Sequence, residues 1–353
     1  MAAMITADDA NIVTSMANDE SNTKPTTTSE TKSSFSSSST TTTTTNTTGQ
    51  FPFFPSEAEM WGRPNTLTEK ESQSLAEFRT IIPALELREV KMANEADDAC
   101  LLRVLRADDF QVSVCKEAWD KSMKWRRKHR LWDRLNDSAT DIIFNGNISL
   151  DDIVRKYPFG VKGRDKKGRP ISYKLAGKTD QSIFDEVGVE NLIQWEAVVA
   201  SKTVHYLLPK CAVESGYHVE NYAQIVDLDG ISVTSFGSNM KTAIKGSIKL
   251  CGDNFPETMG ATYIINAPWY FRTIWAVVRT FIEPETVKKV HVFSSPDELK
   301  SVIDLDMLPV EYGGTGKLGL GSLNDLYTPE ACWELEAGRP DSWGPDPFAI
   351  IEQ

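Results

Sequence analysis

The fold is decided by residues 261–282, which read ATYIINAPWYFRTIWAVVRTFI. The first five of these residues are apolar, aromatic or β-branched and predict a buried strand. A helix apolar around most of its circumference is predicted from Pro268 to about Ile282. Its polar residues, on one narrow stripe, are Arg272, Thr273, Arg279 and Thr280. The helix is shorter than the roughly 20 residues that span a bilayer, so it is either a core helix or has one face in an apolar cavity.

Short apolar runs alternate with helical patterns on both sides of this stretch. The predicted strands are 159–161, 171–175, 223–228, 261–265 and 290–293. The polar, glycine-containing residues 164–169 separate the first two and indicate a hairpin. Further helices are predicted over 189–208, ended by Pro209, then before Pro256, and over 294–302. Strands separated by helices predict an α/β domain with a largely parallel sheet that is covered on both faces.

Before about residue 148 the sequence predicts helices without strands. Apolar residues at helical spacing indicate an all-helical unit over 66–140. A basic cluster on its last helix is interpreted as a solvated helix face; its members are Lys121, Lys124, Arg126, Arg127, Lys128 and Arg130. Residues 1–55 are rich in Ser and Thr and are expected to be a disordered tail. Residues 317–353 are expected to be an extension that packs back on the domain.

Composition excludes several classes of function. The chain has 353 residues, 40% of them hydrophobic, which is enough for a core. A formal net charge of -12 argues against sequence-independent binding to nucleic acid, which needs a basic face. No apolar window is long enough to span a membrane, and the N-terminus has no secretory signal. We therefore expect a cytoplasmic monomer whose contact with organelle membranes is peripheral.

Motifs for catalysis or metal binding are missing from the sequence. The five cysteines include no C-x-x-C pair, and the four histidines have no metal-ligand spacing. Residues 314–319 match G-x-G-x-x-G, but they follow the last predicted strand instead of the first, so an oxidoreductase is kept only as an alternative. We expect no enzyme activity, no catalytic residue, no metal and no cofactor.

Five ordered motifs between about residues 97 and 316 resemble the CRAL-TRIO family of lipid-binding proteins. They are residues 101–107 with 124–126, residues 165–170, residues 225–230, residues 255–257 with 264–268, and residues 308–314. They are most similar to the branch of the family that transfers phosphatidylinositol. The resemblance implies a helical leader over 66–140, followed over 148–316 by a mixed sheet that floors a large apolar cavity.

The resemblance also implies a function, in which the chain encloses one phospholipid and releases it at a membrane. The 268–282 helix would then be a mobile gate, with its other face, rich in Trp and Tyr, at the membrane interface. The gate and cavity residues implied are Trp269, Phe271, Ile274, Trp275, Val278 and Phe281.

Family members that bind phosphatidylinositol use a Glu, a Thr and a Lys, which match Glu257, Thr286 and Lys289 here. A Lys and a Thr can donate hydrogen bonds to a phosphodiester, and a Glu can accept them from inositol hydroxyls. The chain departs from many relatives near this site. The departures are Asp108, Asp109 and Thr258, where relatives have basic residues, and Tyr222 and Gln224, where some relatives contact phosphatidylcholine.

A second interpretation comes from a different class of protein. The same pocket could belong to a lipid sensor that presents its lipid to a lipid kinase or binds a small GTPase. Such a module would be expected to carry a partner domain, whereas only residues 317–353 follow the motifs. Fast exchange of lipid between vesicles would favour a carrier, and tight binding without exchange would favour a sensor.

Overall fold

The computed structural model describes residues 62–63, 66–92, 95–129, 143–144 and 148–315. The tail predicted over 1–55 and the extension predicted over 317–353 lie outside the described residues, as does most of the glycine run at 314–319.

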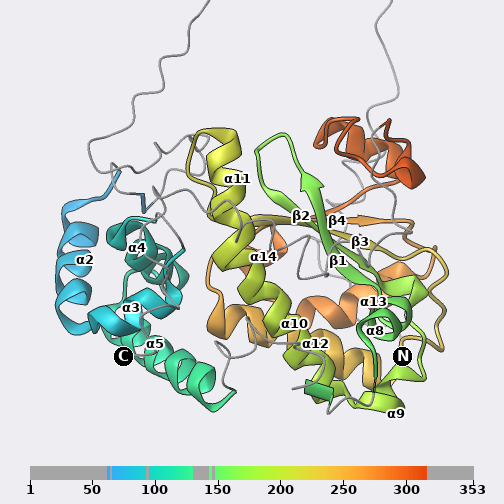
Figure 1. Cartoon of the computed structure of the whole chain (residues 1–353), viewed down its shortest axis with the longest axis horizontal. Coiled ribbons are helices and arrows are strands. Elements are labelled where there is room, and N and C mark those ends of the chain that lie inside the picture. Colours follow the sequence, from blue (N-terminus) through green and yellow to red (C-terminus); the bar gives the residue numbers. More distant parts are fainter. Residues whose placement is uncertain (1–61, 64–65, 93–94, 130–142, 145–147, 316–353) are drawn as a thin grey trace, which may run out of the picture. The chain divides into compact units, whose positions relative to one another are not determined.

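Four helices form the first part of the described chain (Figure 1). They are α2 (Glu69–Ile81), α3 (Ala84–Val90), α4 (Asp97–Ala107) and α5 (Val112–Lys128). α2 begins with a capping box in which the Thr68 side chain and Glu71 satisfy each other's backbone N–H groups. Phe78, Leu102 and Leu105 are fully buried between these helices, so the unit has an apolar core of its own.

The lipid domain implied by the motifs is built on a five-stranded sheet in the order β1-β2-β3-β4-β5. The strands are β1 (Phe159–Arg164), β2 (Pro170–Leu175), β3 (Tyr222–Asp227), β4 (Met259–Ile265) and β5 (Val290–Val292). β1 and β2 form the predicted antiparallel hairpin, and β2 to β5 are parallel. The predicted α/β class with a largely parallel sheet is therefore confirmed.

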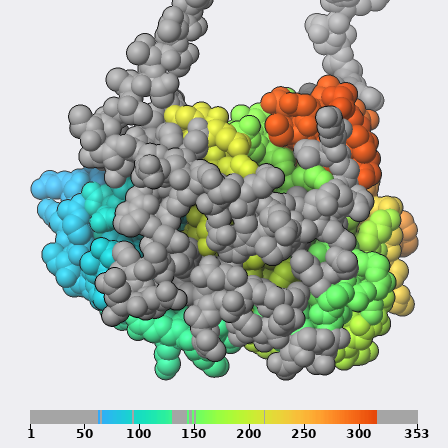
Figure 2. Space-filling model, viewed as in Figure 1, coloured from blue at the N-terminus to red at the C-terminus, as the bar shows by residue number. Residues whose placement is uncertain are grey.

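The two faces of the sheet are covered by different kinds of structure. The helices of the domain are α8 (Leu150–Lys156), α9 (Ile183–Val187), α10 (Val189–Lys202), α11 (Leu208–Ser215), α12 (Ser238–Asn254), α13 (Phe271–Val278) and α14 (Pro284–Val287). Right-handed connections between parallel strands in sequential order place their helices on one face. On the other face, Tyr173 and Ile225 pack against Leu299 and Leu308, from segments that contain only 3-10 turns. In Figure 2 the segment that contains these 3-10 turns, in orange-red, lies beside the green β1–β2 hairpin. Lys166 of the hairpin donates to the Lys300 carbonyl.

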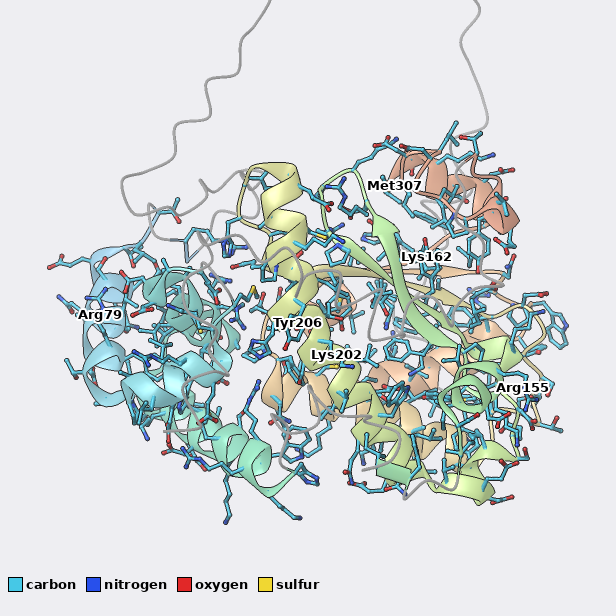
Figure 3. All side chains as sticks on the ribbon, viewed as in Figure 1. Arg79, Arg155, Lys162, Lys202, Tyr206 and Met307 are labelled. Atoms are coloured by element: carbon cyan, nitrogen blue, oxygen red, sulfur yellow. The ribbon has the colours of Figure 1, made fainter. Side chains whose placement is uncertain are left out.

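The helix expected to end at Pro209 instead continues to Ser215. α10 runs into a π-helical turn over Thr203–Leu207, and α11 follows without a break. Figure 3 labels Lys202 and Tyr206 along this segment. In this wider π turn the Leu208 N–H donates to the Thr203 carbonyl, and the helix continues through Pro209, which has no N–H to donate. The prediction of a helix end at Pro209 was wrong because sequence patterns do not reveal a π turn.

The helix predicted to begin at Pro268 begins three residues later. Residues 268–270 form a turn in which the Phe271 N–H donates to the Pro268 carbonyl. The Tyr270 hydroxyl also donates to the Ile231 carbonyl, which ties this turn to the loop after β3. α13 then ends at Val278, and one 3-10 turn continues it to Phe281. The apolar segment is therefore a short helix between two turns.

Candidate functional site

A cavity of about 960 Å³ lies between the sheet and the helices that cover it, and it extends to α4 and α5 of the N-terminal helical unit. Its volume is near the upper end of the range of roughly 300–1,000 Å³ that small-molecule sites occupy. Because side chains alternate along a strand, every second residue of β2, β3 and β4 faces the cavity. These floor residues are Ser172, Lys174, Tyr222, Gln224, Val226, Thr262 and Ile264.

The apolar part of the cavity wall comes mainly from α12 and α13, and α12 also contributes the polar residues Lys245, Ser247, Lys249, Asp253 and Asn254. Met240, Ile244 and Ile248 of α12 recur every fourth residue, so one stripe of that helix faces the cavity. Phe236 extends this wall before the helix begins. An apolar wall of this size can hold hydrocarbon without leaving polar backbone groups unpaired, because the helices satisfy their own backbone.

The structure places five of the six expected gate residues on the cavity. Phe271, Ile274, Trp275 and Val278 lie at helical spacing on one side of α13, and Phe281 follows on the 3-10 turn. Trp269 is the exception. It does not line the cavity, and 90% of it is exposed. The expectation placed Trp269 inside because it assumed a helix from Pro268, whereas Trp269 lies in the turn before α13 and outside the inward stripe.

The outer side of α13 combines apolar and basic residues. Thr273, Ala276 and Val277 are exposed between Arg272 and Arg279. We call these five residues, together with the exposed indole of Trp269, the outer gate face. Tryptophan and arginine at such positions suit the polar boundary of a membrane, where the ring is partly apolar and the guanidinium meets phosphates.

The structure brings together the three expected head-group residues at one edge of the cavity. The Lys289 ammonium lies 3.2 Å from a Glu257 carboxylate oxygen and 3.5 Å from the Met259 carbonyl. Thr286, on α14, lines the same edge, and its carbonyl accepts the Lys289 N–H. All three side chains are half-buried. An ammonium, a hydroxyl and a carboxylate at this edge can bind a phosphodiester and a ring of hydroxyls.

Glu257 belongs to a turn that is held by two buried arginines from the N-terminal helices. Glu257 itself has a φ of 57°, a conformation that residues other than glycine adopt rarely. Arg126 of α5 donates to the Asn254 carbonyl at 2.7 Å, and Arg103 of α4 donates to the Pro256 carbonyl at 3.4 Å. The helical unit therefore fixes the backbone that presents Glu257 to the cavity.

The arginine at 126 corrects an expectation from the sequence. The basic cluster on α5 was interpreted as a solvated face, yet Arg126 is only 2% exposed, and burial lowers its pKa to about 10. A signal for this was present, because Arg126 continues the stripe of Cys115, Trp119 and Met123 at intervals of four, four and three residues. Arg127, the next residue, is exposed and pairs with Glu86, as a solvated face would predict.

The departures from the family pattern have different structural roles. Thr258 is buried and donates its hydroxyl to the Phe255 carbonyl, so it stabilises the Glu257 turn. Tyr222 and Gln224 lie on the cavity floor. Asp108 lines the cavity, and burial together with the neighbouring Asp109 raises the pKa of its carboxyl group.

A second polar group inside the cavity was not anticipated. Lys174 donates to a Glu196 carboxylate oxygen at 2.7 Å, and the Tyr157 hydroxyl donates to the same oxygen. Burial by itself would lower the pKa of Lys174. The negative charge of Glu196 outweighs this effect, so the pKa of Lys174 is raised. The signal in the sequence was that Ser172 and Lys174, two residues apart, place polar side chains on the same face of a buried strand.

Two other features of the described residues bear on function. They contain no group of three or more His, Cys, Asp or Glu side chains arranged to hold a metal ion. In that same part of the chain, no helix has both the length and the apolar character needed to cross a membrane.

Comparison with known proteins places the chain in a family. Residues 154–314 match the family model described as CRAL/TRIO domain. The chain is 31% identical over 261 residues to Sec14 cytosolic factor from Schizosaccharomyces pombe, covering 72% of this chain and 85% of that protein. The chain therefore belongs to the CRAL-TRIO family, as the motifs indicated.

Another relative and a solved structure agree with this assignment. The chain is 32% identical over 227 residues to Phosphatidylinositol/phosphatidylcholine transfer protein SFH4 from Arabidopsis thaliana. That match covers 63% of this chain but spans only 36% of the plant protein's length. The crystal structure of Sfh5 matches with a TM-score of 0.57 at 16% identity, over 78% of this chain and 98% of that chain. At this identity the structural match supports the fold alone.

Proposed function

We propose that this protein binds one phospholipid in the cavity and transfers it between membranes. The observation that carries the proposal is the combination of a cavity of about 960 Å³, an apolar helix along it and a polar edge at one end. A phospholipid has the same two parts, apolar chains and a polar head. The relative from Arabidopsis thaliana, named as a phosphatidylinositol/phosphatidylcholine transfer protein, supports the same class of function.

The energetics require an enclosed carrier instead of a surface groove. Each methylene group moved from hydrocarbon into water costs about 0.8 kcal/mol, so two chains with roughly 30 such groups would cost about 25 kcal/mol. The cavity must therefore replace the bilayer for nearly the whole length of both chains. No covalent bond changes in this process, so the proposal requires no catalytic group.

Phosphatidylinositol is the lipid that the polar edge suits best. Lys289 and Glu257 pair with each other in the structure. With lipid, the ammonium would bind the phosphodiester, and the carboxylate would accept hydrogen bonds from the inositol hydroxyls. Thr286 supplies one further hydroxyl at this edge.

Exchange of the lipid requires α13 to move. This helix is short, lies between two turns and carries the outer gate face described above. We infer that the protein is cytoplasmic, that this face touches the membrane transiently, and that α13 then opens so that the chains enter the bilayer without crossing water.

Adjacent residues of α13 provide the test. Val278 lines the cavity, whereas Val277 is exposed on the outer gate face. The Val278→Asp variant should lose bound phospholipid, because a buried carboxylate would face the acyl chains, while Val277→Asp should still be isolated with lipid. Phospholipid extracted from each purified variant is the measurement. Equal lipid content in the two variants would refute the proposal that phospholipid binds in this cavity. Protein that is isolated with its lipid but does not exchange it between vesicles would favour a lipid sensor.

A further inference from the structure

The cavity holds a second set of polar side chains, which we call the floor polar group. Its members are Tyr157, Ser172, Lys174, Glu196 and Gln224. All five side chains line the cavity. Among the described residues, no hydrogen bond joins them to Glu257 or Lys289.

The floor polar group is well separated from the head-group edge. Ser172, Gln224, Thr262 and Val290 are successive register partners across β2, β3, β4 and β5. Lys289 directly precedes Val290, so three strand spacings separate it from Ser172. At about 4.8 Å per spacing the separation is roughly 14 Å. A single head group bound at Lys289 therefore leaves the floor polar group to acyl chains or to another ligand.

Two polar atoms of this group have no hydrogen-bond partner in the part of the chain that the structure describes. The Ser172 hydroxyl is buried, with the residue 3% exposed, and it has no hydrogen-bond partner among the described residues. Both bonds to Glu196 end on Oε1, so its Oε2 accepts no hydrogen bond from the part of the chain that the structure describes. A donor hydroxyl and an acceptor oxygen without partners in an apolar cavity indicate a ligand that can both accept and donate.

The charges of the group restrict that ligand further. Lys174 and Glu196 neutralise each other, so neither an anion nor a cation has a free counter-charge. The Lys174 ammonium lies 5.5 Å from the centre of the Tyr157 ring and 5.6 Å from that of Phe159. These are the aromatic faces that would receive a quaternary ammonium, and they already hold a cation. A phosphocholine group is therefore disfavoured, and an uncharged hydroxyl is favoured.

We propose that the floor polar group binds the hydroxyl of an uncharged two-chain lipid of the diacylglycerol class. The lipid hydroxyl would donate to Glu196 Oε2 and accept from the Ser172 hydroxyl, while the chains fill the space otherwise taken by phospholipid. This inference rests on the proposed function, because it uses the same cavity as an alternative cargo site.

Three lipids that share their acyl chains test the inference. Wild-type protein is incubated with vesicles that contain radiolabelled dioleoylglycerol, dioleoylphosphatidylcholine or dioleoylphosphatidylinositol, then re-isolated and counted. The decisive variant is Ser172→Ala, which removes one hydroxyl that bonds to none of the described residues and so should fold. Its matched control is Tyr173→Phe, which removes another buried hydroxyl without a partner from the next residue, on the opposite face of the sheet.

We expect wild-type protein to take up more dioleoylglycerol than dioleoylphosphatidylcholine. The Ser172→Ala variant should lower dioleoylglycerol uptake about two- to tenfold, the effect of one hydrogen bond, and should lower phosphatidylinositol uptake by a clearly smaller factor, because only acyl chains of that lipid would face the hydroxyl. The Tyr173→Phe variant should change neither. Equal uptake of the glycerol and choline lipids, or equal effects of the two variants, would overturn the inference. If the wild-type protein took up no phosphatidylinositol, that result would instead contradict the proposed function.

Discussion

Replacing Lys289 with methionine should reduce affinity for phosphatidylinositol without unfolding the protein. Methionine keeps much of the lysine stem and removes the ammonium that lies 3.2 Å from Glu257. A hydrogen bond between a charged group and its partner contributes about 1.5–3 kcal/mol. The ammonium must first leave Glu257, and because both side chains are about one-third exposed, we assign that ion pair only about 0.5 kcal/mol.

The difference leaves a net loss of about 1 to 2.5 kcal/mol, or roughly 5- to 60-fold in affinity for phosphatidylinositol. Stability should fall by less than about 1 kcal/mol, because the lost ion pair is partly exposed. The assay is transfer of phosphatidylinositol and of phosphatidylcholine between vesicles, with a thermal melt of each variant. Phosphatidylcholine also has a phosphodiester, but it has no inositol ring to bind Glu257 and hold its head group at this edge, so its transfer should change less.

The adjacent lysine supplies the control. Lys288 is exposed and pairs with Glu285 at 2.7 Å, outside the cavity lining. Lys288→Met removes the same charge from the same turn and should keep transfer close to the wild type. If both variants transferred phosphatidylinositol equally well, the assignment of Lys289 to the head group would be refuted.

Three further predictions follow from the buried arginine, the exposed tryptophan and the buried histidines. Arg126→Met should lower the free energy of unfolding by about 2–4 kcal/mol, since it leaves a buried carbonyl unpaired, whereas Arg127→Met should change it by less than about 1 kcal/mol in urea denaturation. Trp269→Ala should weaken sedimentation of the protein with vesicles while leaving the amount of bound lipid unchanged, because this side chain is 90% exposed. Burial lowers the pKa of His218 to about 4 and that of His205 to about 3, below the usual 6.5. Between pH 6.5 and 4 the unfolded chain therefore binds more protons than the folded chain, so the free energy of unfolding should fall as the pH drops through this range.

Each of these predictions has a result that would count against it. Equal loss of stability in the Arg126 and Arg127 variants would mean that burial of Arg126 contributes nothing. Trp269→Ala protein that sediments like the wild type would remove the outer gate face from the membrane contact. A melting temperature that stays constant between pH 6.5 and 4 would show that folding does not lower the pKa values of the two histidines.

The sequence predicted the sheet well because its signals are local. Alternating and apolar runs identified all five strands, and the polar residues 164–169 identified the hairpin. The helix at Pro209 was mispredicted because proline ends an α-helix but is tolerated after a π turn, which depends on backbone geometry along several residues. Local pattern therefore predicts which elements form better than it predicts where they end.

The site was predictable only where a family motif marked it. Glu257, Thr286 and Lys289 were named from the resemblance, and the structure places them at one edge of the cavity. Lys174 and Glu196 were missed, because their pairing joins a strand to a helix 22 residues away and leaves no spacing pattern. Such contacts arise from the tertiary fold, so the family resemblance indicated the residues of the polar edge, whereas the floor polar group was not predicted from the sequence.

Native mass spectrometry of the protein, re-isolated after incubation with vesicles of equal phosphatidylinositol and phosphatidylcholine content, tests the central claim most directly. We expect one phospholipid per chain, with phosphatidylinositol in excess over phosphatidylcholine. A spectrum that contains only the lipid-free chain would contradict the account.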